Sequence, residues 1–168
     1  MSYFGSEKKI NLSISAISST NLQTISTTVT DVTVFNGGSL TQVASSIGYP
    51  SISISSNVVT LEAGWRYCIE VKMKSSLTSA STAVNYLIYY ITDTSNNITS
   101  STGTVLIYRD NTASFSQEKC IQFFDATSEQ KQFKIRAVRG GSINCSINGS
   151  IDTQTSDMRS HILIKAWK

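Results

Sequence analysis

The one histidine of the chain, His161, is the only residue that could act as the base of a serine-type catalytic triad. Asp152 or Asp157 would then orient the imidazole, and a serine would be the nucleophile. The chain has no Gly-x-Ser-x-Gly motif. With 29 serines in the sequence, a serine near His161 is expected by chance. We therefore expect His161 to be a strand-edge or interface histidine and not a catalytic one.

The sequence also disfavours a pair of catalytic carboxylates for glycoside hydrolysis and a calcium-binding loop. Glycoside hydrolysis needs two acids about 5 to 9 Å apart, but the 11 acidic residues are spread over turns and polar strand faces. Asp93, Ser95 and Asn97 have a loose spacing of calcium-binding oxygens. Ile98 and Thr104 stand where an EF-hand loop needs Gly and Glu. We expect a hairpin turn there, and we predict no enzymatic activity, cofactor or metal.

The three cysteines, Cys68, Cys120 and Cys145, lie inside strand-like runs and have no Cys-x-x-Cys spacing. A zinc site or a redox motif is therefore not expected. Buried free thiols are the default interpretation, and one disulfide with a leftover thiol is the alternative.

Residues 84–91, with the sequence VNYLIYYI, are the stretch that the other elements must support. At the two-residue period of a strand, both faces of this segment are apolar or aromatic. A strand with one face in water would alternate apolar and polar residues. One face can enter the core of its own domain, whereas the other needs a cover, and no segment has a convincing helical period. The simplest cover is another copy of the same chain.

Short alternating runs separated by turn signals recur along the sequence, and about ten of them predict an all-β sandwich or barrel. Residues 65–73 form the strongest amphipathic run, and residues 93–103 are predicted to be a polar turn. The last run, 160–168, continues almost to the end of the sequence. We expect residues 1–25 to form an N-terminal arm or peripheral strand beside one domain, residues 26–168.

Composition favours protein contacts over nucleic acid. Ser and Thr together number 48 of 168 residues, charged residues are 15%, and the net charge is +3. A Thr-rich, β-branched, charge-poor chain suits sheet surfaces that pack against other protein. The densest basic group is interpreted as the polar face of one strand, and a phosphate-binding stripe is the alternative. Its members are Lys131, Lys134, Arg136 and Arg139.

The order of features from about residue 50 to 168 resembles the jelly roll of the tumour-necrosis-factor and complement-globular-head family. The segments that carry the resemblance are NVVTLEAGWRYCIEVKM from Asn57, then VNYLIYYI, QEKCIQFFDA, KQFKIRAV and the final SHILIKAWK. Gly64 followed by Trp65 and Tyr67 is the local signature. The resemblance implies a jelly-roll β-sandwich of about ten strands that forms a tight homotrimer, with aromatic strand faces around the threefold axis.

The sequence has neither a collagen-like stalk nor a signal peptide, a departure that argues against an extracellular animal ligand. It looks more like the versions of this fold found on tailed phages. We therefore expect a non-enzymatic structural virion protein, assembled in the host cytoplasm, that decorates or cements the capsid or forms a short head spike. The expected partners are its own copies and the major capsid protein or another virion protein, which residues 1–25 would contact. The expected homotrimer interface comprises Tyr86, Leu87, Tyr89, Phe123, Leu163 and Trp167.

The alternative function is a receptor-binding tip that recognises a host surface saccharide. Its binding loops would be residues 75–82, 93–103 and 148–159. Sugar recognition at such loops predicts aromatic side chains on them, and these loops have none. Neither nucleic acid nor a membrane is an expected partner.

Overall fold

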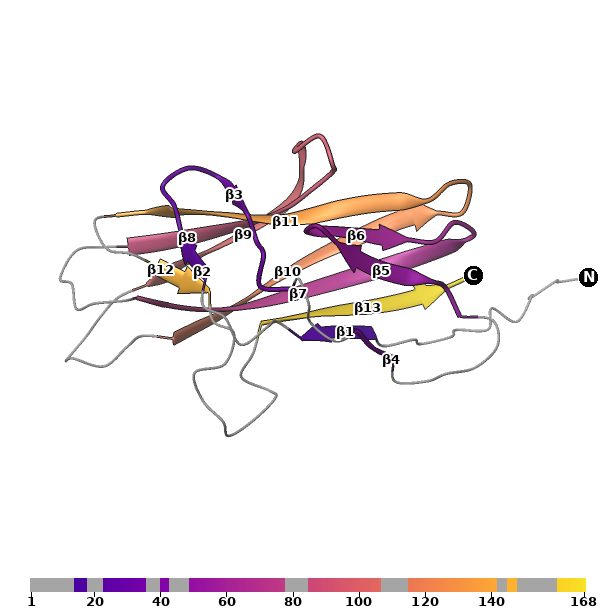
Figure 1. Cartoon of the computed structure of the whole chain (residues 1–168), viewed down its shortest axis with the longest axis horizontal. Helices are drawn as coiled ribbons and strands as arrows, with labels where there is room; N and C mark the ends of the chain where they lie inside the picture. The colour runs from indigo at the N-terminus through magenta and orange to yellow at the C-terminus, as the bar shows by residue number, and fades with distance from the viewer. Residues whose placement is uncertain are drawn as a thin grey trace, which may run out of the picture.

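The computed structural model describes residues 14–17, 23–35, 40–42, 49–77, 85–106, 115–141, 145–147 and 160–168, and no helix occurs among them. Two antiparallel sheets lie face to face (Figure 1). Sheet A has the central order β4 (Leu40–Gln42), β1 (Ile14–Ile17), β13 (His161–Trp167), β7 (Trp65–Leu77) and β10 (Phe115–Ala126). Sheet B has the order β5 (Ile52–Ser55), β6 (Val58–Leu61), β11 (Lys131–Gly140), β8 (Asn85–Thr92) and β9 (Ile98–Leu106).

Three short strands complete these layers within the described residues. They are β2 (Gln23–Ile25) and β12 (Cys145–Ile147) in sheet A, and β3 (Thr30–Asp31) in sheet B. Two facing antiparallel layers with this non-sequential strand order form a jelly-roll sandwich. The predicted all-β jelly roll is confirmed.

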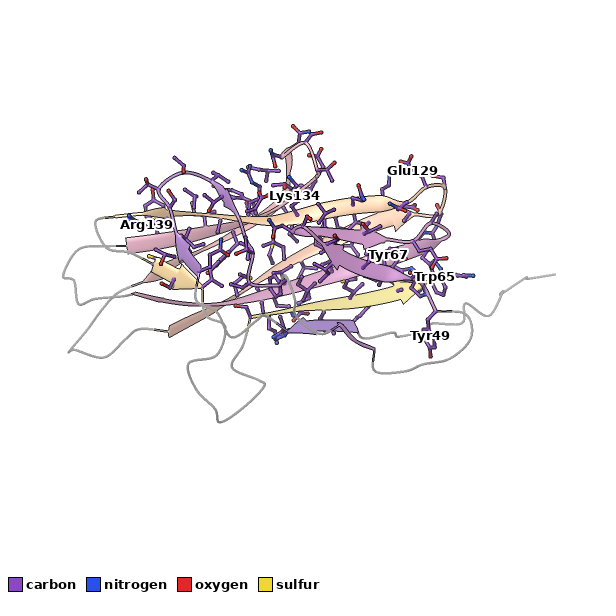
Figure 2. The ribbon with its side chains drawn as sticks, viewed as in Figure 1. Tyr49, Trp65, Tyr67, Glu129, Lys134 and Arg139 are labelled. Carbon is purple, nitrogen blue, oxygen red and sulfur yellow. The ribbon has the colours of Figure 1, made fainter. Side chains whose placement is uncertain are left out.

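Strand β7 is the strand on which sheet A is built, because it pairs along both edges. One edge pairs with β10 from Trp65 to Ser76, and the other pairs with β13 and then with β12. As its alternation predicts, every second side chain of β7 from Trp65 to Met73 enters the core, and each of these is at most 3% exposed. Trp65 and Tyr67 lie between the two sheets (Figure 2). Burial of a large apolar side chain contributes about 1.5 to 3 kcal/mol.

Strand β8 places one face in the chain's own core, as predicted. Leu87, Tyr89 and Ile91 are at most 1% exposed. On the other face Tyr86 is exposed, while Ile88 and Tyr90 are half-buried beside their β11 partners. Side chains of the same sheet therefore supply part of the cover that this face needs.

Residues 23–35 cross from sheet A to sheet B and close one side of the sandwich. Strand β2 pairs with β12, and β3 pairs with β11. The Gln23 side chain holds the crossing, since its Nε2 donates to the Asp31 carbonyl oxygen at 2.8 Å and its Oε1 accepts from the Thr33 amide at 2.7 Å. Strands β1 and β2, which fall within the expected N-terminal arm or peripheral strand of residues 1–25, are thus strands of sheet A. Residues 1–13 lie outside the described residues.

The turn after β8 is shorter than predicted. The Asp93 carboxylate accepts from the Asn97 amide at 2.8 Å and from Asn97 Nδ2 at 2.7 Å, which closes a hairpin turn. Strand β9 then begins at Ile98, so the prediction of a turn over 93–103 is wrong beyond residue 97. The run of Ser and Thr in β9 misled that prediction, because these polar residues pair as an edge strand beside β8.

Gly140 and Tyr86 form a cross-strand pair in which the tyrosine ring covers the glycine. A Cβ atom at residue 140 would lie 1.9 Å from Tyr86 Cζ, so Gly140→Ala must push the ring aside. Because Tyr86 is 44% exposed, the ring can turn into solvent. We expect Gly140→Ala to lower the free energy of unfolding by about 1 kcal/mol. Urea denaturation measures this change.

The double variant Gly140→Ala with Tyr86→Ala is the control for that contact. If the ring is the obstacle, Gly140→Ala costs nothing further once Tyr86 is an alanine. An equal cost in both backgrounds would contradict this account of the pair.

Candidate functional site: the outer face of sheet A

The outer side of sheet A is a regular grid of side chains set by the registers of β10, β7 and β13. Residues that are directly opposite in antiparallel strands point to the same face. The four rows, each read from β10 across β7 to β13, are Asp125–Arg66–Trp167, Phe123–Cys68–Lys165, Ile121–Glu70–Leu163 and Lys119–Lys72–His161. We call these twelve residues the sheet A face.

Large apolar side chains on this face are left in solvent. Phe123 is 65% exposed and Ile121 is 45% exposed, and both belong to β10. Leu163 and Trp167, on β13, are half-buried. The alternate residues of β10 already fill the space between the sheets: Cys120 and Ala126 are buried, and the Phe124 ring stacks on Phe133 with centroids 5.2 Å apart. Phe123 and Ile121 therefore have no core position to occupy in this fold.

Glu70 organises the charges at the middle of the sheet A face. Its carboxylate lies 2.7 Å from Lys119 Nζ and 3.7 Å from Lys72 Nζ, and its side chain is 14% exposed. Burial raises the pKa of Glu70, but the hydrogen bond and charge of Lys119 and the charges of Lys72 and Lys165 outweigh this effect. The pKa of the carboxyl group consequently lies below its ordinary value. Glu70 is ionised at neutral pH and holds two lysine side chains against the sheet.

The three thiols are free, and the default interpretation of buried free thiols holds for two of them. Cys120 and Cys145 are buried as expected, whereas Cys68 is half-buried on the sheet A face. Burial raises the pKa of each of the three thiols, so all are protonated at neutral pH. The hydroxyl of Ser100 lies 3.1 Å from Cys120 Sγ and donates to the Ile121 carbonyl oxygen at 3.2 Å. This contact joins β9 of sheet B to β10 of sheet A along one side of the sandwich.

The structure divides the six expected interface residues among three places. Phe123, Leu163 and Trp167 lie together on the sheet A face. Tyr86 lies on the outer side of sheet B, on the opposite side of the sandwich. Leu87 and Tyr89 are 0% and 1% exposed in the chain's own core, so in this fold they offer no surface to another copy.

Sequence reasoning did not name Ile121, Glu70 or Lys165 as residues of this face. The alternation of β10 places Ile121 beside Phe123, but it does not tell which side of the strand is inward. The partners of Glu70 on the neighbouring strand depend on the register of β7 against β10. The sequence of neither strand alone determines that register. The exposed fraction of Phe123 in the folded chain is what identifies the outward side.

His161 lies at one end of this face, half-buried on β13 opposite Lys72. This is the strand position that the sequence predicts. In the described part of the chain, no three His, Cys, Asp or Glu side chains are close enough together to hold a metal ion. The same residues include no helix long and apolar enough to span a membrane.

Comparisons with known proteins give structural likenesses but no match in sequence. No family model and no curated protein matches the chain. The structure of Eiger TNF from S. frugiperda aligns with a TM-score of 0.48 and 11% identity over 92% of each chain. An arabinose-bound MgGH51 α-L-arabinofuranosidase aligns with a TM-score of 0.34 and 6% identity, over 97% of this chain and 27% of that one. Both TM-scores are below 0.5, so the jelly-roll assignment stands on strand order and register alone.

Replacement of Glu70 by Gln removes the charge that holds Lys72 and Lys119. We expect Glu70→Gln to lower the free energy of unfolding by about 1 kcal/mol at pH 7. The pKa of Glu70 is depressed, so its contribution is present at neutral pH and is lost as the pH falls through the pKa of the folded state. Urea denaturation at pH 7 and in acid should show wild type and variant converging in acid.

Glu129→Gln is the matched control, because Glu129 also pairs with a lysine, Lys131, but its side chain is 68% exposed. This variant should leave the urea midpoint unchanged. A Glu70→Gln variant as stable as wild type at pH 7 would show that the lysine cluster contributes nothing to the fold.

Proposed function

We propose that this protein is a non-enzymatic structural subunit that assembles with its own copies into a homotrimer through the sheet A face. The observation that carries the proposal is the exposure of Phe123 and Ile121 beside Leu163 and Trp167. Contiguous exposed apolar surface marks sites of protein contact. Burial of aromatic side chains at the centre of a contact commonly supplies most of its binding energy.

The contrast between the two outer faces of the sandwich supports the choice of sheet A. The described outer side of sheet B also exposes an aromatic residue, Tyr86, but this ring already covers Gly140. Ile88 and Tyr90, the next residues on the same face of β8, are half-buried. Phe123 is more exposed than Tyr86, at 65% against 44%, and Ile121 lies on the same face of the same strand. Sheet A therefore exposes two large apolar side chains next to each other on one strand.

We further propose that this assembly decorates or cements the capsid of a tailed phage. A charge-poor chain with 48 Ser and Thr residues among 168 suits packing against other protein, and the jelly roll is a fold common among virion proteins. Residues 1–25 are the proposed contact with the major capsid protein or another virion protein. The alternative, a saccharide-binding tip, gains no support from the loops on which it depends, since they carry no aromatic residue.

The mass of the protein in solution, by light scattering coupled to size exclusion, tests the assembly. Wild type should give a species near three times the 18.3 kDa chain. Phe123→Asp places a charge at the centre of the contact and should give a monomer, with the dissociation constant raised at least about tenfold. Because Phe123 is 65% exposed, the variant should keep the wild-type fold, which far-UV circular dichroism checks.

Ile98→Asp is the matched control for surface hydrophobicity. Ile98 is 60% exposed on β9 and lies outside the sheet A face, so this variant should assemble as wild type does. A monomeric wild type would contradict the homotrimer. If Ile98→Asp disrupts the assembly as strongly as Phe123→Asp, the choice of face is wrong.

Capsid decoration is tested with purified empty capsid shells of the tailed phage that encodes the protein. Added wild-type protein should co-sediment with the shells and raise their melting temperature in differential scanning calorimetry. Binding to host cells with no effect on shells would instead support the saccharide-binding tip.

A further inference from the structure

The apolar patch of the sheet A face consists of Ile121, Phe123, Leu163 and Trp167. Lys165 is a positive charge in the middle of this patch. It lies on β13, with Leu163 and Trp167 as its neighbours on the same side of the strand. Across the sheet it is opposite Cys68, which is in turn opposite Phe123. The Lys165 side chain is exposed, so its ammonium group reaches solvent above the patch.

Each of the other lysines and arginines of the sheet A face has a carboxylate oxygen within 4.0 Å, whereas Lys165 acts on Glu70 only from a greater distance. Lys72 and Lys119 share Glu70, and Arg66 Nε lies 3.8 Å from an Asp125 carboxylate oxygen. Among the residues that the structure describes, Lys165 has no carboxylate within 4.0 Å. Glu70, the acid in the adjoining row, is already engaged by two lysines. The face therefore carries one cation that its own residues leave to solvent.

A surface that covers the patch must also deal with this charge. Lys165 lies between Leu163 and Trp167, so a partner that buries both of them also removes water from the ammonium group. Burial of an unpaired charge is strongly unfavourable, whereas a carboxylate on the partner would satisfy it. The long aliphatic stem of lysine can pack on apolar neighbours while its head reaches such a group.

The chain itself carries complementary charge at one end of the sandwich. The turn after β6 and the turn after β10 meet there, where the Gly64 amide donates to the Ala126 carbonyl oxygen at 2.7 Å. Glu62 and Glu129, on these two turns, are exposed; within the chain Glu129 pairs with Lys131, and Glu62 accepts a hydrogen bond from the Ser51 amide. Figure 2 shows Glu129 at the same end of the molecule as Trp65. We call Glu62 and Glu129 the acidic end.

We propose that Lys165 of one copy pairs with a carboxylate of the acidic end of the neighbouring copy. This inference rests on the proposed self-assembly and names the charged group that determines how neighbouring copies are positioned. The contact joins a face of one copy to an end of the next, so it is heterologous. Heterologous contacts close into a ring when the rotation allows, which is the symmetry that a trimer needs.

Charge reversal tests the pairing. Lys165→Glu should raise the dissociation constant of the assembly at least tenfold, measured by sedimentation at 50 mM and 500 mM NaCl, with the larger effect at low salt. Lys165→Arg keeps the charge and should assemble as wild type does. Both variants should keep the far-UV circular dichroism spectrum of wild type, because the side chain is exposed.

Rescue identifies the partner group. Lys165→Glu combined with either Glu62→Lys or Glu129→Lys should restore wild-type assembly in one of the two combinations. If neither combination restores it, or if Lys165→Glu assembles normally, the pairing is overturned while the proposed self-assembly stands. A monomeric wild type would overturn both.

Discussion

The constraint on which the fold depends is the strict alternation of β7. Its odd-numbered residues from Trp65 to Met73 are apolar and fill the space between the sheets, while its even-numbered residues are cysteine or charged and stay outside. Because β7 pairs along both edges, its register determines which residues of β10 and β13 point outward. A slip of one residue would exchange the two faces and put Glu70 and Lys72 into the core. The length of the strand, 13 residues, extends this constraint along most of sheet A.

The exposed patch follows from that register. Strand β10 has large side chains on both of its faces. Only one of these faces can point into the core, because the register of β10 against β7 is fixed. Cys120, Phe124 and Ala126 take the inner positions, which leaves Ile121 and Phe123 outside. Glu70 keeps the lysines next to them in fixed positions, so the face combines apolar surface with ordered charge. This combination suits specific contact with another protein better than general solubility does, because the apolar area supplies affinity and the charges restrict which surface fits.

Periodicity alone was enough to predict most strands, an all-β sandwich or barrel and the core face of 65–73, because burial on one side of a strand leaves a two-residue pattern. The jelly-roll class was instead an implication of the family resemblance. It was not enough to place Leu87 and Tyr89, since both faces of residues 84–91 are apolar and nothing in the segment tells which one is inward. The Ser and Thr residues of β9 resemble a loop in sequence, yet they pair with β8. The grouping of Phe123, Leu163 and Trp167 depends on strands about 40 residues apart in sequence, whose neighbour is β7 in both cases. Such groupings follow from pairing, which local patterns do not encode.

The most direct test of the account is hydroxyl-radical footprinting of the native wild-type protein, which compares the oxidation rates of Phe123 and Ile98 with their rates in the urea-unfolded chain. In an isolated chain the two side chains are nearly equally exposed, at 65% and 60%. If the sheet A face is covered in the assembled protein, folding should protect Phe123 several times more strongly than Ile98. Equal protection of the two side chains would show that the sheet A face is open to solvent and would contradict the central claim.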